Sequence, residues 1–312
     1  MKKIITTLWM IMIAINLLFA QTFNPQKLQE IASNEKQNLI ERKERVLEFL
    51  KTSNYKKSIQ FDDGTKAILV DVIDGYPQYV TTHNLQARYT TGVEFVQSES
   101  GLNLPFYGKN MTIGVWDGGL VLNSHQEFEK RIKNKLGSEY SNHATHVSGT
   151  IAASGVNPEA KGMLPEVTIH SYYAFEDDLG PMAEEAANGL ILSNHSYGLI
   201  LGWRYNGDAW QWYGQENGKD NRFGSYTNDS RSIDNIAYNA PLYTIVWSAG
   251  NDRSDVGDGT RPPDGPFNIV GPAASAKNII TVGAITGFEE YEGPSSAEIS
   301  GFSSWALLMM VE

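Results

Sequence analysis

Between residues 111 and 284, short runs rich in β-branched residues alternate with stretches of helical spacing, and this alternation limits the possible folds more than any other feature of the chain. The runs and stretches follow one another in the order Met111–Val115, His143–Ser154, Val167–Tyr172, Met182–Gly189, Leu190–Ser193, Ile233–Tyr238, Tyr243–Trp247 and Ile279–Ala284. The pattern predicts an α/β domain with a mostly parallel central sheet and helices on both faces. Because chemistry in such folds gathers beyond the carboxyl ends of the strands, the polar residues after each apolar run are the candidates for function.

The segment before this region predicts a small separate unit. Apolar residues recur at helical spacing from Pro25 to Lys51, where Asn24 can cap the helix and Pro25 can take its first position. Three extended runs follow, with an Asp-Gly turn signal between the second and the third: Ile59–Phe61, Ala67–Ile73 and Tyr76–Thr82. Charged residues are dense here and glycine becomes frequent after Gly101, so we place the boundary near residues 89–95. The sequence thus predicts a small α+β leader.

The first twenty or so residues have the layout of a signal peptide. Lys2 and Lys3 precede the apolar stretch Ile4–Ala20, which polar Gln21 follows. A membrane anchor is the alternative, but the stretch is just short of the ~20 residues that span a bilayer. We expect cleavage after Ala20, a secreted or periplasmic protein, and no stable membrane span after cleavage. The predicted organisation is a signal peptide over residues 1–20, a leader over 21–92 and the α/β domain over 93–312.

Composition excludes several classes of function. The chain of 312 residues carries 25 Lys and Arg against 36 Asp and Glu, a net charge of −11, so it offers no basic surface for the phosphates of a nucleic acid. It contains no cysteine, which excludes disulfides, thiol nucleophiles and Cys-ligated zinc. With 41% hydrophobic residues the chain has enough apolar mass for a packed core.

Three polar residues stand where the predicted fold collects its chemistry. Asp117 ends the run that begins at Thr112 and is followed by two glycines. His143 lies in the first turn of a predicted helix that Asn142 can cap, and Asn251 follows the strand that ends near Ser248. An aspartate beside a histidine would fix its tautomer and stabilise the imidazolium formed when the ring takes a proton from a hydroxyl. An asparagine amide could donate to an oxyanion.

These residues, in this order, resemble the motifs of the subtilisin-like serine peptidases, and the resemblance runs from about Gly108 to Trp305. Asp117-Gly118-Gly119 resembles the catalytic Asp motif, and His143-Ala144-Thr145-His146-Val147-Ser148-Gly149-Thr150 resembles the catalytic His motif, with His143 as the base. Further matching segments are Gly162–Pro165 before the next strand, Ser196–Gly198 as the substrate-pairing strand, Ser248–Asn251 as the specificity wall with the oxyanion asparagine, and Pro272–Ala284. Gly118 and Ala144 depart from the commonest family form, but both are small.

The resemblance implies a serine endopeptidase that hydrolyses peptide bonds in polypeptides by an Asp-His-Ser mechanism, as a monomer and without a cofactor for the chemistry. The leader would then be a pro-segment that acts as a foldase or an inhibitor. The residues expected to bind substrate are Ser196, Tyr197, Gly198, Ser248, Ala249 and Gly250. Because segments of this kind can pair with an extended peptide as an added strand, unfolded polypeptides are favoured over small esters.

Other polar and aromatic clusters have simpler interpretations. We expect His146 to be a buried helix residue with local hydrogen bonds, and we expect His195 to be structural. A zinc site at His143 and His146 is disfavoured, because their spacing does not match the helical zinc motif. The aromatic stretch Leu201–Tyr226 could form a lip over the substrate cleft, but an insertion packed on its own aromatic residues is preferred. Four acidic residues could bind calcium, although a solvated loop is preferred: Asp252, Asp255, Asp258 and Asp264.

The nucleophile of the family is absent from the sequence. No Gly-Thr-Ser-Met/Leu-Ala motif occurs, and Ser303 and Ser304 match a structural Phe-Ser-Ser-Trp segment. Deleting one nucleotide from suitable codons for the family's continuation, Gly-Pro-Thr-Asp-Asp-Gly-Arg-Ile-Lys, yields the whole string Ala306–Glu312 and a stop. We therefore expect a frameshift truncation after Trp305, which leaves only the N-terminal part of a catalytic domain and an inactive chain. The alternative is a non-catalytic peptide-binding protein that retains the cleft.

Overall fold

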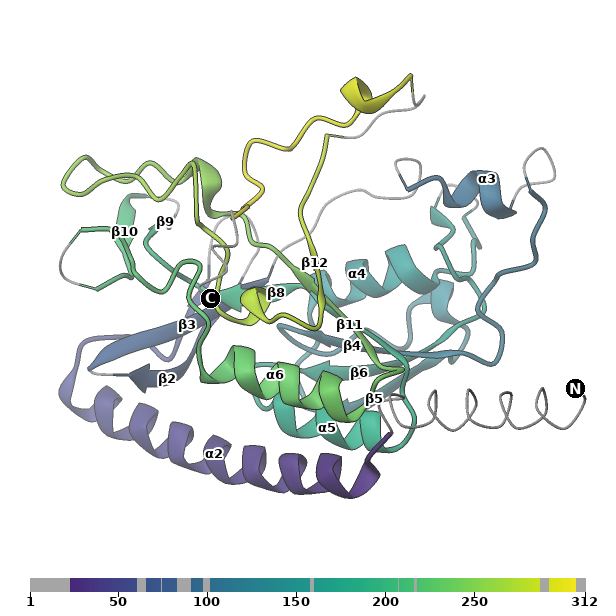
Figure 1. Ribbon diagram of the computed structural model, residues 1–312, viewed down its shortest axis with the longest axis horizontal. Helices are drawn as coiled ribbons and strands as arrows, with labels where there is room; N and C mark the ends of the chain where they lie inside the picture. The colour runs from purple at the N-terminus through teal and green to yellow at the C-terminus, as the bar shows by residue number, and fades with distance from the viewer. Residues whose placement is uncertain are drawn as a thin grey trace, which may run out of the picture.

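A six-stranded sheet in which every pairing is parallel forms the centre of the molecule, with strand order β12-β11-β7-β4-β6-β5 (Figure 1). This computed structural model describes residues 23–60, 66–73, 75–82, 91–97, 102–157, 160–206, 208–215, 218–286 and 292–306. The strands are β4 Thr112–Asp117, β5 Ile132–Leu136, β6 Thr168–Tyr173, β7 Leu192–His195, β11 Thr244–Ser248 and β12 Ile280–Val282. All except β5 match runs expected from the sequence. The predicted signal peptide, residues 89 and 90 of the predicted domain boundary, and residues 307–312 of the string Ala306–Glu312 lie outside the described residues.

Helices cover both faces of this sheet. On one face, α4 (Asn142–Ala152) packs Ala144 and Val147 against Val115 of β4. On the other face lie α5 (Leu179–Ala187) and α6 (Asn228–Asn239), whose buried residues join one core with Trp116, the next residue of β4. Successive strand residues point to opposite faces, so β4 serves both cores at once. The predicted α/β fold with helices on both faces is confirmed.

The leader forms a helix and a small antiparallel sheet. Helix α2 (Pro25–Thr52) starts as predicted, because the Asn24 side chain accepts a hydrogen bond from the Lys27 N–H at 2.9 Å and Pro25 takes the first position. The strands are β1 Ser58–Gln60, β2 Lys66–Ile73 and β3 Tyr76–Thr82, and β8 (Tyr197–Leu199) from the domain completes the sheet in the order β1-β2-β3-β8.

Helix α2 lies across α5 and α6 on the outside of the molecule (Figure 1). Its residues Leu28 and Ile31 are buried in the same core as Met182 of α5 and Ile236 of α6. The Asn24 N–H donates to the Asn239 carbonyl at 2.9 Å, so the start of α2 is tied to the end of α6. The leader is thus docked through both its helix and its sheet.

Several elements differ from the sequence predictions. Helix α4 is capped by Ser141, whose hydroxyl accepts the Ala144 N–H at 3.2 Å, and not by Asn142, which is already helical. The elements that were not predicted are β5, the short helix α3 Val93–Gln97, the hairpin of β9 Trp203–Tyr205 and β10 Trp210–Trp212, and the 3-10 turns Gln126–Phe128, Asp252–Ser254, Ala273–Ser275 and Pro294–Ser296. No helix in the described part of the chain is both long and apolar enough to cross a membrane.

Candidate active site

The end of β4 and the start of α4 bring Asp117 and His143 into direct contact. Nδ1 of His143 lies 2.9 Å from both carboxylate oxygens of Asp117. The Asp117 side chain is fully buried, whereas that of His143 is 16% exposed. The backbone N–H of Gly118 donates to Asp117 Oδ1 at 2.7 Å, so the turn after the strand also holds the carboxylate.

The surroundings of this pair determine which nitrogen of the ring can act as a base. Burial raises the pKa of Asp117, and the hydrogen bonds from His143 and from the Gly118 N–H oppose that rise. When Nδ1 carries the proton and donates it to the carboxylate, Nε2 keeps its lone pair on the opposite side of the ring. Nε2 is then the atom that can accept a proton from a hydroxyl, while the carboxylate stabilises the imidazolium that results.

A row of three stacked rings lies one residue before the ends of β4 and β11 and aligns these two strands. In the strand register, Trp116 and Trp247 both pair with His195 of β7. The His195 ring stacks on Trp116 at 5.1 Å and on Trp247 at 4.4 Å between centroids. Asp117 and Ser248, the next residues of their strands, therefore end at the same edge, two strand spacings or about 10 Å apart.

His195 is structural, as predicted. Its ring is fully buried, and burial lowers its pKa to about 3, which keeps the ring neutral. Its Nε2 lies 2.8 Å from the Ser193 hydroxyl and its Nδ1 lies 3.2 Å from the Tyr197 hydroxyl. Both ring nitrogens thus have partners inside the core.

Asn251 follows β11 at this same edge and opens the turn Asp252–Ser254. The preceding Gly250 has a φ of +109°, and a Cβ there would lie 3.0 Å from Ser304 Oγ, so the bend before Asn251 requires glycine. The Asp252 N–H donates to Ser304 Oγ at 3.0 Å. Ser304 is 1% exposed, and this structural role matches the prediction for Ser303 and Ser304.

The two segments expected to bind a peptide differ in what they already bind. In Ser248–Gly250, the Ala249 N–H donates to the Val282 carbonyl and the Gly250 carbonyl accepts the Ser304 N–H, both at 2.9 Å. In the other segment, Ser196 Oγ accepts a hydrogen bond from the Asn194 amide at 3.0 Å. The residues after it form β8, which pairs antiparallel with β3 through Tyr197, Gly198 and Leu199. The strand expected to receive substrate is therefore already paired with β3, the last strand of the leader.

Two expectations about polar residues are wrong. His146 is exposed on the surface of α4 and not buried, because the buried side of this helix is occupied by Ala144, Val147 and Ser148. The loop with Asp252 and Asp264 is not simply solvated, since these residues are 9% and 3% exposed. Asp264 accepts the Trp203 N–H at 2.7 Å, and burial raises its pKa to about 8. Within the described residues, no three His, Asp or Glu side chains are arranged to hold a metal ion.

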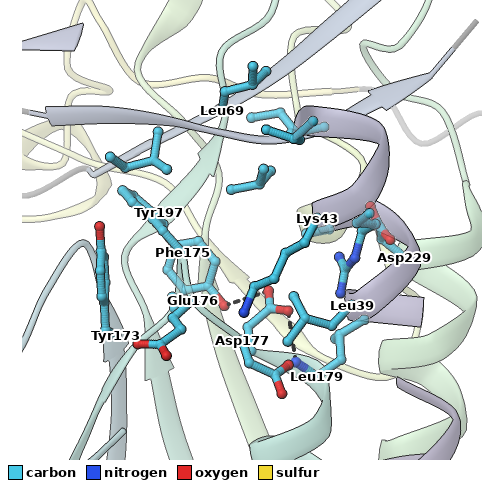
Figure 2. A pocket seen from close by; sticks show the side chains of 18 of the residues that line it. Leu39, Lys43, Leu69, Tyr173, Phe175, Glu176, Asp177, Leu179, Tyr197 and Asp229 are labelled. Carbon is cyan, nitrogen blue, oxygen red and sulfur yellow. Dashed lines mark hydrogen bonds between the residues drawn. The ribbon is translucent and has the colours of Figure 1, made fainter. Parts of the chain in front are cut away.

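A cavity of about 540 Å³, which the sequence reasoning missed, lies between the leader and β8 (Figure 2). The leader contributes Arg42 and Lys43 from α2. The domain contributes the acidic run Glu176-Asp177-Asp178, and burial raises the pKa of Asp177 to about 6. The sequence signal for it was the position of this run, which two residues separate from the end of β6. The positive charges of Arg42 and Lys43 oppose the rise in the pKa of Asp177, so charge complementarity joins the hydrophobic packing of α2 in docking the leader.

The chain is similar to several known proteins. A serine protease/ABC transporter B family protein of Dictyostelium discoideum is 23% identical in an alignment 267 residues long, and the match covers 75% of this chain but only 13% of that protein. A cold-adapted subtilisin-like serine proteinase is 20% identical, with a TM-score of 0.42 and coverage of 72% of this chain and 71% of that chain. The prenylagaramide maturation protease PagA is 18% identical, with a TM-score of 0.43 and coverage of 64% and 59%. The subtilase family, peptidase S8, matches residues 108–307, more than half of the chain, and the protein therefore belongs to this family of serine proteases.

Proposed function

We propose that this chain carries the Asp-His half of a serine endopeptidase centre that acts on polypeptides. The observation that carries the proposal is the contact of His143 Nδ1 with both oxygens of the buried Asp117 at 2.9 Å. In the proposed reaction, Nε2 of His143 takes the proton of a serine hydroxyl as its oxygen attacks the peptide carbonyl, and later returns it to the leaving amine. Asn251 would donate to the oxyanion, an interaction worth about 10² to 10³ in kcat.

The serine of this mechanism is not among the printed residues, so we propose that the chain as written does not cleave peptides. Removing the serine of a subtilisin costs on the order of 10⁶ in kcat. We propose that a frameshift after Trp305 accounts for its absence. The DNA beyond the stop should then encode a Gly-Thr-Ser motif in another frame, and its absence there would remove the frameshift from the proposal.

We further propose that residues 21–92 are a pro-segment, that residues 93–312 are part of the catalytic domain, and that a signal peptide over residues 1–20 exports the protein to the periplasm or the medium. The pairing of β3 with β8 supports the inhibitory role, because it fills the strand that the family resemblance assigns to substrate. The shared core of α2, α5 and α6 supports a role in folding. A leader docked in this way must leave before a substrate can pair with β8.

Self-cleavage tests this function. If the DNA beyond the stop encodes the Gly-Thr-Ser motif, restoring the reading frame after Trp305 would give a longer chain with the serine, and we expect that chain to cut itself between the leader and the domain. His143→Ala in that chain should stop the cut, whereas His146→Ala, a change of the exposed histidine on the same helix, should not. If the frame-restored chain that keeps His143 stays uncut, the peptidase proposal is contradicted and the non-catalytic peptide-binding alternative is favoured. The strand pairing at β8 is the observation that supports this alternative.

A further inference from the structure

Residues 201–226, between β8 and α6, contact the leader through both polar and aromatic side chains. We call this segment the aromatic insertion. Within it, Trp203 packs edge-on against Trp212 at 5.2 Å between centroids, as a self-packed insertion should. Trp203 is also fixed to the domain, because its backbone N–H and its indole N–H donate to Asp264 and to the Pro262 carbonyl. Trp203 therefore anchors the insertion to the domain.

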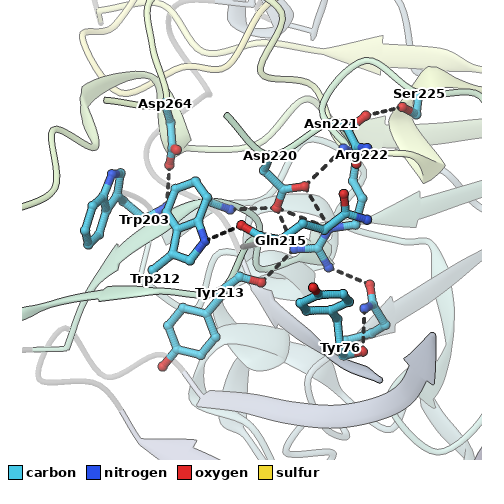
Figure 3. Close-up of polar contacts among 12 residues, drawn as sticks. Tyr76, Trp203, Trp212, Tyr213, Gln215, Asp220, Asn221, Arg222, Ser225 and Asp264 are labelled. Carbon is cyan, nitrogen blue, oxygen red and sulfur yellow. Dashed lines mark hydrogen bonds and ion pairs between the residues drawn. The ribbon is translucent and has the colours of Figure 1, made fainter. Parts of the chain in front are cut away.

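Arg222 in this insertion has its guanidinium fixed from two sides. Its Nε donates to Asp220 Oδ1 at 2.9 Å, and its Nη2 donates to the Tyr213 carbonyl at 2.8 Å (Figure 3). Asp220 is 3% exposed and also accepts the Gly202 N–H at 3.0 Å, so the carboxylate itself cannot swing away. The remaining Nη1 donates to Gln78 Oε1 of β3 at 2.6 Å. A guanidinium held in this way presents one donor at a fixed point beside the strand.

The next residue of β3, Tyr79, contacts a different part of the insertion. Tyr79 is 1% exposed and packs edge-on against Tyr213, with ring centroids 5.6 Å apart and planes at 79°. Its carbonyl accepts the Ile200 N–H, which extends the β3–β8 ladder by one residue. Ile200 and Tyr213 are the buried residues that the domain contributes to the core around Tyr79. Because neighbouring strand residues face opposite sides, Gln78 and Tyr79 are recognised separately.

We propose that the aromatic insertion is a specificity element which selects extended polypeptide segments with a glutamate or glutamine directly before an aromatic residue. This inference rests on the proposed function, because it takes β8 as the strand that receives substrate. A substrate strand in the place of β3 would offer its acceptor side chain to Arg222 and its ring to Tyr213 and Ile200. A glutamate there makes a charge-assisted hydrogen bond and is preferred over glutamine, whereas a lysine faces the guanidinium and is rejected.

Peptide binding to a chain with a weakened leader strand tests the proposal. In an antiparallel ladder every second residue pair is hydrogen-bonded, and Tyr79 with Ile200 is such a pair. The next bonded pair is therefore Thr81 with Gly198, in which the Thr81 N–H donates to β8. Thr81→Pro in the full chain removes this one hydrogen bond. The probes are fluorescent peptides with the sequence of residues 75–90, in which Gln78-Tyr79 is kept or changed to Glu-Tyr, Lys-Tyr or Gln-Ala. We expect the Glu-Tyr peptide to bind best. The Lys-Tyr and Gln-Ala peptides should each bind at least tenfold more weakly than the Glu-Tyr peptide.

Matched variants separate specificity from binding. Arg222→Gln should remove the difference between the Glu-Tyr and Lys-Tyr peptides, whereas Arg231→Gln, the same change at an exposed arginine of α6, should keep it. Equal affinity for all four peptides overturns the specificity but leaves peptide binding at β8 intact. No binding of any peptide overturns β8 as the substrate strand and this inference with it.

A second measurement needs no weakened leader. In the full chain, Gln78→Lys should speed amide hydrogen exchange in residues 197–200 at least tenfold, because the lysine faces Arg222. Adding Arg222→Gln should restore most of the slow exchange, which a merely structural role of either residue would not do. Unchanged exchange in Gln78→Lys, or no restoration in the double variant, contradicts the proposal.

Discussion

Glu127 should control the stability of the loop that leaves the helix of His143. Its carboxylate is 4% exposed and accepts the backbone N–H groups of Gly155, Val156 and Asn157 at 2.8, 3.0 and 2.9 Å. Glu127→Gln keeps one acceptor oxygen, loses at least one of these bonds and turns the others from charge-assisted into neutral bonds. Since a hydrogen bond to a charged group contributes about 1.5–3 kcal/mol, the variant should lose about 3 kcal/mol.

Hydrogen exchange of the loop measures this loss directly. A change of about 3 kcal/mol in the free energy of local opening speeds the exchange of residues 155–157 on the order of 100-fold, while exchange in α5 stays as it was. Glu166→Gln, a change of an exposed glutamate, is the matched control. Loop exchange that differs by less than threefold from the unaltered chain would refute the reasoning, because it would mean that the three bonds contribute almost nothing.

The pH dependence of the same variant has a definite sign. The backbone hydrogen bond from Asn157 leads the contributions that lower the pKa of Glu127 from its usual 4.5, against the effect of burial. A carboxyl with a lowered pKa stabilises the folded state fully above its unfolded pKa and loses that effect as the pH falls through its folded pKa. The difference between the unaltered chain and Glu127→Gln should therefore be full at neutral pH and shrink below about pH 4.5.

Three further predictions concern the leader, the ring row and the catalytic pair. Tyr79→Ala should loosen the leader by about 3–5 kcal/mol, seen as faster proteolysis of the leader, whereas Tyr79→Phe, which loses only the hydrogen bond to the Lys56 carbonyl, should cost about 1 kcal/mol. Burial lowers the pKa of His195 to about 3, so its contribution to stability is full above pH 6.5 and falls towards pH 3; His195→Gln should flatten the denaturation midpoint measured across that range. In the frame-restored chain, Asp117→Asn should slow self-cleavage by about 10⁴, because the ring loses the partner that sets its tautomer, and an unchanged rate would contradict the proposed role.

Features that depend on local pattern were predicted well from the sequence. The central strands β4 and β11 have apolar runs, and the N-terminus of α2 has a capping residue followed by proline, so each leaves a signal within a few residues. Strand β5 was missed because it is an edge strand with the alternating pattern Ile-Lys-Asn-Lys-Leu, of which only Ile132 is fully buried. An edge strand needs less apolar surface than a central one and so leaves a weaker signal.

Features that depend on contacts between distant segments were not predictable in the same way. The pairing of Thr81 with Gly198 joins two short strands that carry no mark of their partner. The burial of Asp264 depends on the Trp203 N–H, which reaches it only when the aromatic insertion folds back onto the domain. Composition alone favoured a solvated loop, because acidic residues are rarely buried unless a partner is present.

The contact between Asp117 and His143 does not by itself separate an enzyme from a binding protein. The strand end with Asp117, the Gly118 N–H and the helix that Ser141 caps all lie within residues 112–152, so residues of this short segment are enough to form the pair at 2.9 Å. A binding protein that had lost its nucleophile would keep the same geometry, because each of these supports also serves the core. The leader separates the two cases: an enzyme must release β3 from β8 by cutting the chain, whereas a binding protein must exchange β3 for its ligand without a cut. Self-cleavage of the frame-restored chain that stops on His143→Ala is therefore the decisive result, and strand exchange at β8 without any cut is the outcome that would replace the peptidase with a binder.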